Sequence, residues 1–159
     1  MNRRIIFACA AAVAAAWSTS AAPAVAETAD LDAVKAANSA FYAALSKRDA
    51  AAMTALWANK PYVVNIGPRS KSIESGYADA VTKYWANAFN NVFLELKASM
   101  TSMAQVQSDG KLAWVVGTEH AEGKTKDGPF AFDTFATNVF EKDGDRWLLV
   151  SHQAGIQPK

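Results

Sequence analysis

Residues 130–153 read FAFDTFATNVFEKDGDRWLLVSHQ. We interpret Phe130 to Glu141 with the period of two that is clearest from Leu94 to Met100, where apolar and polar residues alternate; Asp143-Gly144 follows, and an apolar run begins at Trp147. A period of two is typical of a β-strand with one buried face, and an Asp-Gly pair between two such runs favours a tight hairpin turn. The stretch therefore predicts two antiparallel strands, Phe130 to Glu141 and Trp147 to Gln153.

The same period of two continues toward the N-terminus as far as Phe93. It predicts a strand from Phe93 to Gln107 and another from Leu112 to Glu122, joined by a hairpin turn at Asp109-Gly110. A looser turn is expected over Gly123 to Pro129. We therefore expect four consecutive antiparallel strands in the C-terminal half of the chain.

The N-terminal half has the period of a helix instead. Apolar residues recur every three or four positions from Asp30 to Arg48, which predicts one amphipathic helix. A second helix is expected over Ala50 to Trp57 with Asp49 as its N-cap, then a strand over Tyr62 to Ile66 and a third helix from Tyr77 to Phe89. This order predicts an α+β fold, with three helices packed on one face of a curved antiparallel sheet.

Residues 1–26 have the organisation of a secretory signal peptide. A basic start precedes an apolar run from Ile5 to Trp17, and Ala24-Val25-Ala26 forms an A-x-A cleavage site. The apolar run is shorter than the ~20 residues that cross a bilayer, so we expect no stable membrane insertion after cleavage. The sequence predicts an exported protein, periplasmic or secreted, whose residues 27–159 form a single domain.

Composition excludes several classes of function. The chain has 16 Lys+Arg against 15 Asp+Glu, and this near-neutral balance without a basic stripe argues against a nucleic-acid partner. Cys9 is the only cysteine and lies in the predicted signal peptide, so the domain would have neither a disulfide nor a thiol nucleophile. The two histidines lack the spacing of metal ligands, and no glycine-rich phosphate loop is present. We therefore predict no metal and no cofactor.

The order of elements and several short motifs resemble the nuclear transport factor 2-like superfamily, in particular its SnoaL-like branch. The motifs run from Ala44-Leu45 through Asp49 to Leu56-Trp57, then Gly76, Tyr84-Trp85 and the closing DGDRWLLV at 143–150. The last is similar to the DG-x-W-x-I-V hairpin of that family. The resemblance implies a conical sheet with a pocket at its open end, often in a dimer. It implies no single activity, because relatives include isomerases, cyclases, dehydratases, epoxide hydrolases, ligand binders and assembly modules.

The turn lengths predict which side chains face such a pocket. A two-residue turn at Asp143-Gly144 pairs Phe140 with Trp147 and Asn138 with Leu149, while the looser turn places His120 near Phe132 and Thr118 near Thr134. His152 is then expected on the opposite face unless a bulge intervenes. The predicted ligand-binding residues are Tyr42, Trp57, Tyr62, Trp85, Trp114, Thr118, Thr134, Asn138, Ser151 and Gln153.

Three functions fit this pattern. The favoured hypothesis is binding of a small apolar or amphipathic molecule in an aromatic-lined cone. The alternative is a cofactor-independent isomerase, cyclase or dehydratase with His120 as the catalytic base, assisted by Tyr62, Asn138 or Ser151. A structural dimer module fits if the cone is filled by its own aromatic side chains. Binding is favoured because no acid except Glu122, at the rim, is predicted on the pocket face.

The outer face of the sheet is predicted to form a homodimer. Leu148 is apolar where SnoaL-like relatives usually have a polar residue, so its strand is apolar on both faces. Such a strand must be covered on both sides, and pairing with a second copy of the sheet would do this.

Overall fold

A computed structural model describes residues 22–158 of the chain. The predicted signal peptide lies outside the described residues except for its end, which begins the first helix. The helical elements are α1 (Ala22–Lys47), α2 (Ala50–Ala55), η1 (Tyr77–Lys83), α3 (Tyr84–Asn87) and η2 (Ala88–Val92), where η marks a π-helix. The strands are β1 (Val64–Ile66), β2 (Glu74–Ser75), β3 (Phe93–Ser108), β4 (Leu112–Thr125), β5 (Gly128–Asp143) and β6 (Arg146–Ile156). Among these residues, no helix is long and apolar enough to span a membrane.

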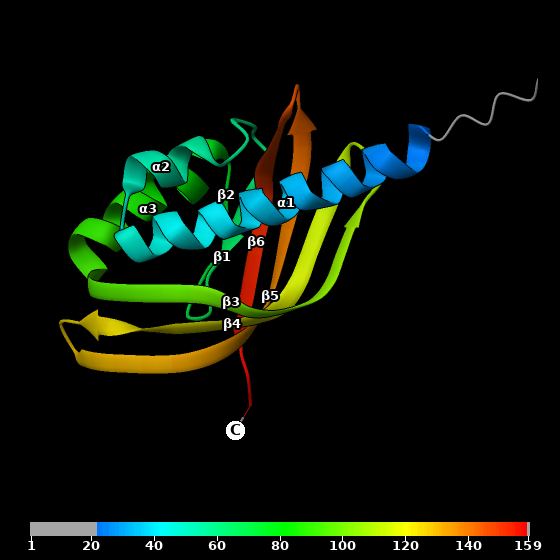
Figure 1. The fold of residues 1–159 in the computed structure, drawn as a ribbon. Coiled ribbons are helices and arrows are strands. Elements are labelled where there is room, and N and C mark those ends of the chain that lie inside the picture. The colour runs from blue at the N-terminus through cyan, green and yellow to red at the C-terminus, as the bar shows by residue number, and fades with distance from the viewer. Residues whose placement is uncertain (1–21, 159) are drawn as a thin grey trace, which may run out of the picture.

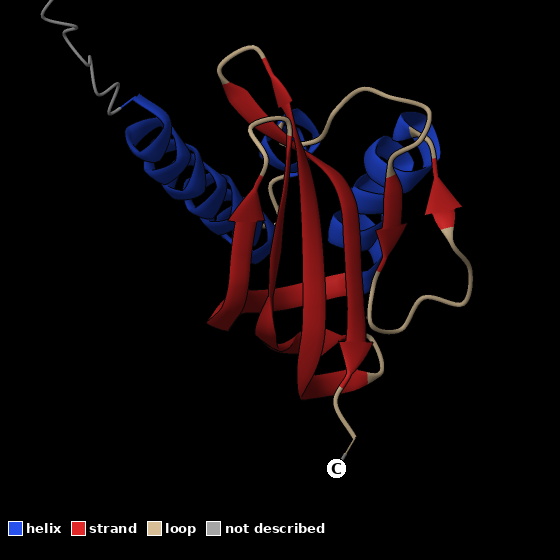
Figure 2. Cartoon of the chain, turned by 90° about the vertical axis from the view of Figure 1, so that its right-hand side faces the viewer, coloured by secondary structure: helices blue, strands red, loops and turns tan. Residues whose placement is uncertain are grey.

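The six strands form one curved sheet in the order β2-β1-β6-β5-β4-β3. The four long strands make the predicted antiparallel meander, and β1 joins it parallel to β6. In Figure 1, α1 lies across the concave side of this sheet, and Figure 2 shows the helices behind the strands. The predicted α+β fold, with helices on one face of the sheet, is confirmed.

Local sequence signals account for the helix ends. The Asp49 side chain accepts a hydrogen bond from the Ala52 amide at 2.9 Å and caps α2 as predicted. The third helix begins at Tyr77 as expected but changes between π- and α-helical geometry. Strand β2 lies between the predicted strand and the predicted third helix, and the sequence gives no sign of it because two residues are too few to show a period.

Helix α1 is attached to the sheet at both ends. Near its start, Asp30 pairs with Lys142 of β5, with Nζ 2.6 Å from the carboxylate oxygen. Near its end, the Ser46 hydroxyl donates to the Ala98 carbonyl and accepts from the Ala98 amide of β3, both at 2.9 Å. Between these contacts, Phe41 is fully buried against Trp85. From Asp30 to Ser46, the helix therefore covers the concave side of the sheet.

The turn between β4 and β5 is tighter than the sequence indicated. Lys126-Asp127 alone form the turn, and Thr125 pairs with Gly128. As a result His120 pairs with Asp133 and Glu119 with Thr134, so the predicted pairing of His120 with Phe132 is wrong by one residue. A shift of one exchanges the two faces of a strand. Glu119 therefore lies on the concave face, while Trp114, Thr118 and His120 lie on the convex face.

A β-bulge changes the register between β5 and β6. Phe140 pairs with Leu149 but Val139 pairs with Ser151, which leaves Val150 as the extra residue. The predicted pairings of Phe140 with Trp147 and of Asn138 with Leu149 are both wrong. The two-residue turn is Gly144-Asp145 rather than Asp143-Gly144, which pairs Phe140 with Leu149, and beyond the bulge Asn138 pairs with His152. The bulge turns His152 inward, where it is 3% exposed, and places Ser151 on the convex face.

Two glycines of β4 allow the sheet to bend. A Cβ on Gly117 would overlap the Ser102 carbonyl oxygen, and a Cβ on Gly123 would overlap the Glu95 carbonyl oxygen. Both contacts lie beside irregularities in the pairing of β3 with β4. Bulges opposite glycines are the usual means of curling a sheet. The close approach of β3 to β4 at these positions therefore shapes the cone.

We predict that Gly117→Ala lowers the free energy of unfolding by about 1–3 kcal/mol, because the added methyl group forces the backbones of β3 and β4 apart. The matched control is Gly155→Ala in β6, where an added Cβ meets no atom within 4 Å. Urea unfolding followed by tryptophan fluorescence measures both variants. Equal stability of the two would contradict this account of the bend.

Candidate functional site

Seven polar side chains meet inside the cone, and we call them the interior polar cluster. Its members, each 5% exposed or less, are Asn38, Tyr42, Asn65, Glu119, Thr134, Asn138 and His152. They come from one face of α1 and from the concave face of β1, β4, β5 and β6. A buried polar group costs about 1–3 kcal/mol unless it is hydrogen bonded. A cluster of this size inside a small domain therefore needs an explanation beyond stability.

Asn138 is at the centre of the cluster. Its Nδ2 group donates to Asn38 Oδ1 at 2.7 Å and lies 3.4 Å from the Tyr42 hydroxyl oxygen. Its Oδ1 lies 2.7 Å from His152 Nδ1. Because this oxygen can only accept a hydrogen bond, the proton of the neutral His152 ring is on Nδ1. Nε2 is then unprotonated and can act as a hydrogen-bond acceptor. Burial lowers the pKa of His152 to about 4, so the ring is neutral.

Glu119 is the acid that the sequence did not predict inside the cone. Its Oε1 accepts from the Thr134 hydroxyl at 3.0 Å, while Oε2 is buried with no hydrogen-bond partner among the described residues. Burial raises the pKa of Glu119, and its interactions with Thr134 and Tyr42 oppose this only in part. Burial, and then the charge of Glu119, raise the pKa of Tyr42. A carboxyl and a phenol, both favoured in their protonated forms, therefore lie side by side.

A cavity of about 490 Å³ lies at the open end of the cone. We call it the mouth cavity. Its walls are the loop between β1 and β2, helices α3 and η2, and the tip of the β4–β5 hairpin, which lies below α3 in Figure 1. Phe132 of β5 lines it, and Thr134 follows two residues later on the same face of the strand. The mouth cavity therefore adjoins the interior polar cluster along the concave face of β5.

The predicted ligand-binding residues divide into two groups. Those inside the cone are Tyr42, Trp57, Trp85, Thr134 and Asn138. Those elsewhere are Tyr62, Trp114, Thr118, Ser151 and Gln153. Tyr62 is 53% exposed and donates its hydroxyl to Glu141. None of the ten lines the mouth cavity, whose residues come largely from the loop at 67–74 and the hairpin tip.

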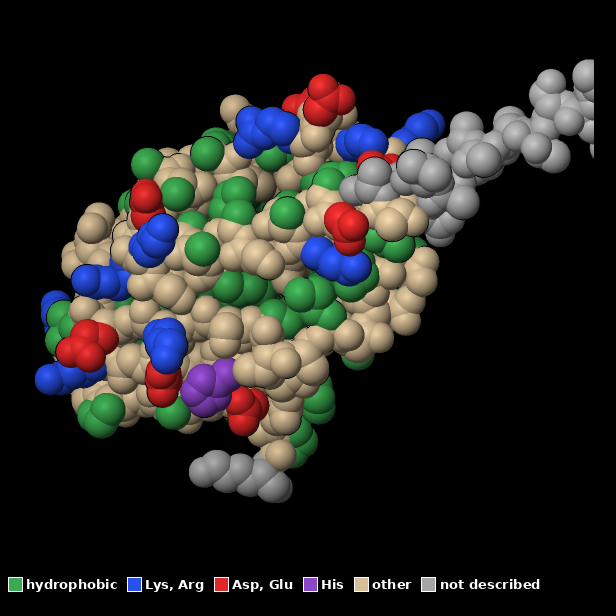
Figure 3. All heavy atoms as spheres, in the orientation of Figure 1, with side chains coloured by type: hydrophobic (Ala, Val, Ile, Leu, Met, Phe, Trp, Pro, Cys, Tyr) green, Lys and Arg blue, Asp and Glu red, His purple; other side chains and the backbone are tan. Residues whose placement is uncertain are grey.

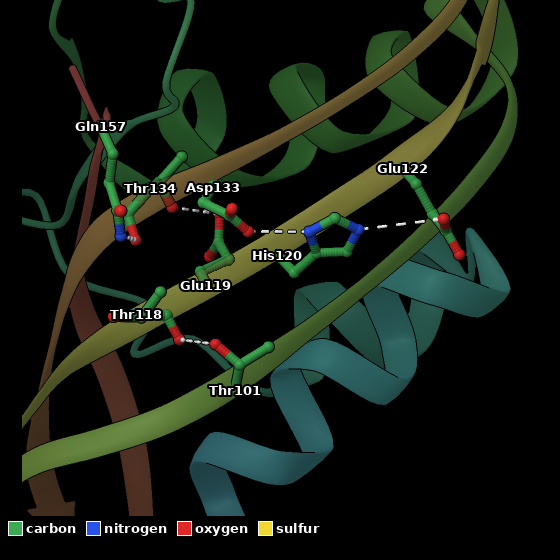
Figure 4. Close-up of polar contacts among 8 residues, drawn as sticks. All are labelled: Thr101, Thr118, Glu119, His120, Glu122, Asp133, Thr134 and Gln157. Carbon is green, nitrogen blue, oxygen red and sulfur yellow. Dashed lines mark hydrogen bonds and ion pairs between the residues drawn. The ribbon is translucent and has the colours of Figure 1, made fainter. Parts of the chain in front are cut away.

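His120 lies on the convex face, outside both compartments. Its Nδ1 is 2.8 Å from Asp133 Oδ1 and its Nε2 is 3.8 Å from Glu122 Oε2, as Figure 4 shows. The hydrogen bond to Asp133 raises the pKa of His120, and the charges of both acids act in the same direction. Since Tyr42, Asn138 and the cavity lie on the other side of the sheet, the geometry gives His120 no place in an interior acid–base site.

Four members of the cluster were missed by the sequence analysis, and two of them had a signal. Asn38 occupies the apolar stripe of α1, four residues after Val34 and three before Phe41. Asn65 interrupts an apolar strand. A polar residue on a buried face indicates a functional position. Glu119 and His152 had no comparable signal, because the face of the sheet on which each lies depends on strand register. The β4–β5 turn sets the register for Glu119, and the bulge in β6 sets it for His152.

The described part of the chain offers no metal site that competes with these two compartments. No group of three or more His, Cys, Asp or Glu residues that could hold a metal ion occurs among residues 22–158. On the face shown in Figure 3, basic and acidic side chains are interspersed. We therefore place the candidate site in the mouth cavity and the adjoining interior polar cluster.

Comparison with known proteins agrees with the fold. The family model of the SnoaL-like domain matches residues 34–157, so the chain belongs to this family, within the nuclear transport factor 2-like superfamily. No curated protein matches the chain. A Streptomyces avermitilis protein, provisionally named as a dehydratase of the nuclear transport factor 2-like family, has 25% identity over 83% of this chain and 99% of its own, with a TM-score of 0.72.

Two further solved structures are similar. One, from Thiobacillus denitrificans, is provisionally named as an association domain of calcium/calmodulin-dependent protein kinase type II. It has 26% identity over 78% of this chain and 94% of its own, with a TM-score of 0.66. The other, from Novosphingobium aromaticivorans, is provisionally named as an aromatic ring hydroxylase. It has 16% identity over 83% of this chain and 92% of its own, with a TM-score of 0.72, and shows a shared fold.

The two histidines are predicted to titrate in opposite directions from the ordinary value of 6.5. His120 should titrate above it, and His152 should stay neutral down to about pH 4. In the unfolded chain His152 is protonated near its ordinary pKa of 6.5, whereas in the folded chain it stays neutral down to about pH 4. The free energy of unfolding should therefore fall by roughly 3 kcal/mol as the pH is lowered from 6.5 to about 4. Imidazole NMR titration measures both residues, with Asp133→Asn as a control that shifts only His120. Two titrations near the ordinary value would contradict the placement of both.

Proposed function

We propose that this protein binds a small amphipathic molecule in the mouth cavity. The observation that carries the proposal is a cavity of about 490 Å³ that combines an aromatic wall with charged and polar side chains. A volume of this size, lined mainly by apolar groups with a few polar ones, is typical of small-molecule sites. The interior polar cluster behind the cavity offers further hydrogen-bonding groups to a ligand that reaches past Phe132.

Three phenylalanines form the aromatic wall. Phe93 and Phe130 have ring centroids 5.8 Å apart, and Phe130 stacks on Phe132 at 5.5 Å. All three rings line the mouth cavity. Covering such a wall with an apolar ligand gains about 25 cal/mol for each Å² removed from water. The wall therefore favours a ligand with a flat or extended apolar part.

A cofactor-independent acid–base enzyme is the second candidate function. It is favoured by Glu119, because a buried carboxyl group of raised pKa beside a tyrosine is an arrangement that general acid–base catalysis uses. Glu119 would exchange the proton, with Tyr42 as the hydrogen-bond donor. The names of the similar dehydratase and hydroxylase structures are compatible with such chemistry. Deuterium exchange into a bound ligand that is lost in Glu119→Gln would support this candidate, and equal exchange in both proteins would eliminate it.

Export also belongs to the proposal, because it rests on residues 1–26 alone. Mass spectrometry of the chain from the native host tests it. A mature mass that starts at Glu27 would support export, and a full-length mass would contradict it.

Filling the mouth cavity should weaken ligand binding. Asn87 lines the cavity from an exposed position on α3, so Asn87→Trp should weaken ligand binding at least about tenfold without disturbing the core. Asn90→Trp is the matched control, since Asn90 is also exposed on the same helical segment but does not line the cavity. Native mass spectrometry for co-purified molecules, followed by calorimetry with those found, measures both. Equal affinity of the two variants would place the ligand elsewhere.

We also propose a homodimer, with exposed aromatic residues of the convex face, rather than Leu148, as the reason for it. Leu148 is only 8% exposed in the single chain, so it needs no partner to cover it. The convex face instead exposes Phe135 at 61% and Trp114 at 41% on neighbouring strands. The similar structure from Thiobacillus denitrificans is named as an association domain, which is compatible with assembly in general.

If the convex face is the dimer interface, Phe135→Lys should yield monomers in sedimentation velocity, because a charge would replace a central apolar contact. Ile73→Lys is the control, as Ile73 is 68% exposed on a loop away from the long strands. A dimer that survives Phe135→Lys would contradict this interface.

A further inference from the structure

We propose that the ligand of the mouth cavity carries an anionic group, such as a carboxylate, which binds Arg69 and Lys71 at the end of the aromatic wall. This inference rests on the proposed function and names the chemical class of the ligand. The remaining part of the ligand would be apolar and would lie on Phe93, Phe130 and Phe132.

Arg69 is positioned on the wall itself. It comes from the loop between β1 and β2, and its guanidinium carbon lies 5.2 Å from the centroid of the Phe132 ring. A guanidinium over a ring face interacts with the π-electrons and leaves its in-plane N–H groups available. Among residues 22–158, no other side chain or carbonyl forms an ion pair or hydrogen bond with Arg69. Its planar N–H groups suit the two oxygens of a carboxylate.

Lys71 supplies a second positive charge from the same loop. It lines the mouth cavity two residues after Arg69 and also has no ion-pair partner within the described part of the chain. The loop is held in place beside α3, because the Ser70 hydroxyl accepts from the Gly67 amide at 2.8 Å and also interacts with the Tyr84 hydroxyl. Two cations on an anchored loop can therefore meet one anionic group.

Two acidic residues, Glu74 and Asp127, also line the cavity. Glu74 accepts a hydrogen bond from Ser72 at 2.7 Å and so has a partner within its own loop. Asp127 belongs to the two-residue turn at the hairpin tip. The cavity lining thus has two basic and two acidic residues, so the positions of these residues, rather than their number, indicate the charge of the ligand. Arg69 lies against the aromatic ring, where the apolar part of a ligand would end, and the ring shields one side of its charge from water.

The test compares three probes with the same skeleton, cinnamate, cinnamyl alcohol and cinnamylamine, by calorimetry on the folded chain. We expect cinnamate to bind most tightly. Arg69→Gln and Lys71→Gln should each weaken cinnamate binding about five- to tenfold and leave cinnamyl alcohol unchanged. Lys126→Gln is the matched control, since Lys126 lies beside Asp127 in the same turn but does not line the cavity. It should change neither affinity.

The possible results separate the inference from the function on which it rests. If cinnamyl alcohol or cinnamylamine binds as tightly as cinnamate, the anionic class is wrong and the cavity remains a binding site. The same holds if Arg69→Gln weakens the acid and the alcohol equally, because Arg69 would then act only through the shape of the loop. If none of the three probes binds, both the inference and the proposed function fail.

Discussion

The pairing of Glu119 with Thr134 across β4 and β5 is the contact on which the interior of this protein depends. A two-residue turn at Lys126-Asp127 sets the register, and a shift of one residue would exchange Glu119 with His120 between the two faces of the sheet. The register thus places a carboxyl group, rather than an imidazole, inside the cone. Because burial removes that group from water, its pKa rises and its neutral form is favoured.

The curvature of the sheet and the position of α1 divide the concave side into two compartments. Beneath α1, Asn38 and Tyr42 complete a cluster of buried polar groups with the strands. Beyond α1, the hairpin tip and the loop carrying Arg69 enclose a cavity to which α1 contributes no side chain. The first compartment is rich in hydrogen bonds, and the second is where we propose that a ligand binds. Binding and acid–base chemistry, the two candidate functions, therefore concern adjacent parts of one site.

Much of the fold could be predicted from the sequence because its signals are local. The period of two, the Asp-Gly turn signals and the capping residue Asp49 each depend on a few neighbouring residues. The structure has the corresponding strands, hairpins and cap, with the second hairpin turn displaced by one residue to Gly144-Asp145. The site could not be predicted in the same way, because it depends on register. The segment from Gly123 to Pro129 contains several turn-forming residues and does not show which two make the turn. Leu148, Leu149 and Val150 are all apolar, so no pattern marks the bulge that turns His152 inward.

The protonation state of Glu119 tests the account most directly. Infrared spectroscopy can follow the carbonyl stretch of a protonated carboxyl group as the pH is raised. In the folded protein, this band should persist at a pH where solvent-exposed carboxyl groups have ionised, and it should be absent from Glu119→Gln. If no such band remains in the wild-type protein, or if it remains unchanged in Glu119→Gln, then Glu119 does not occupy the buried position on which the site is built.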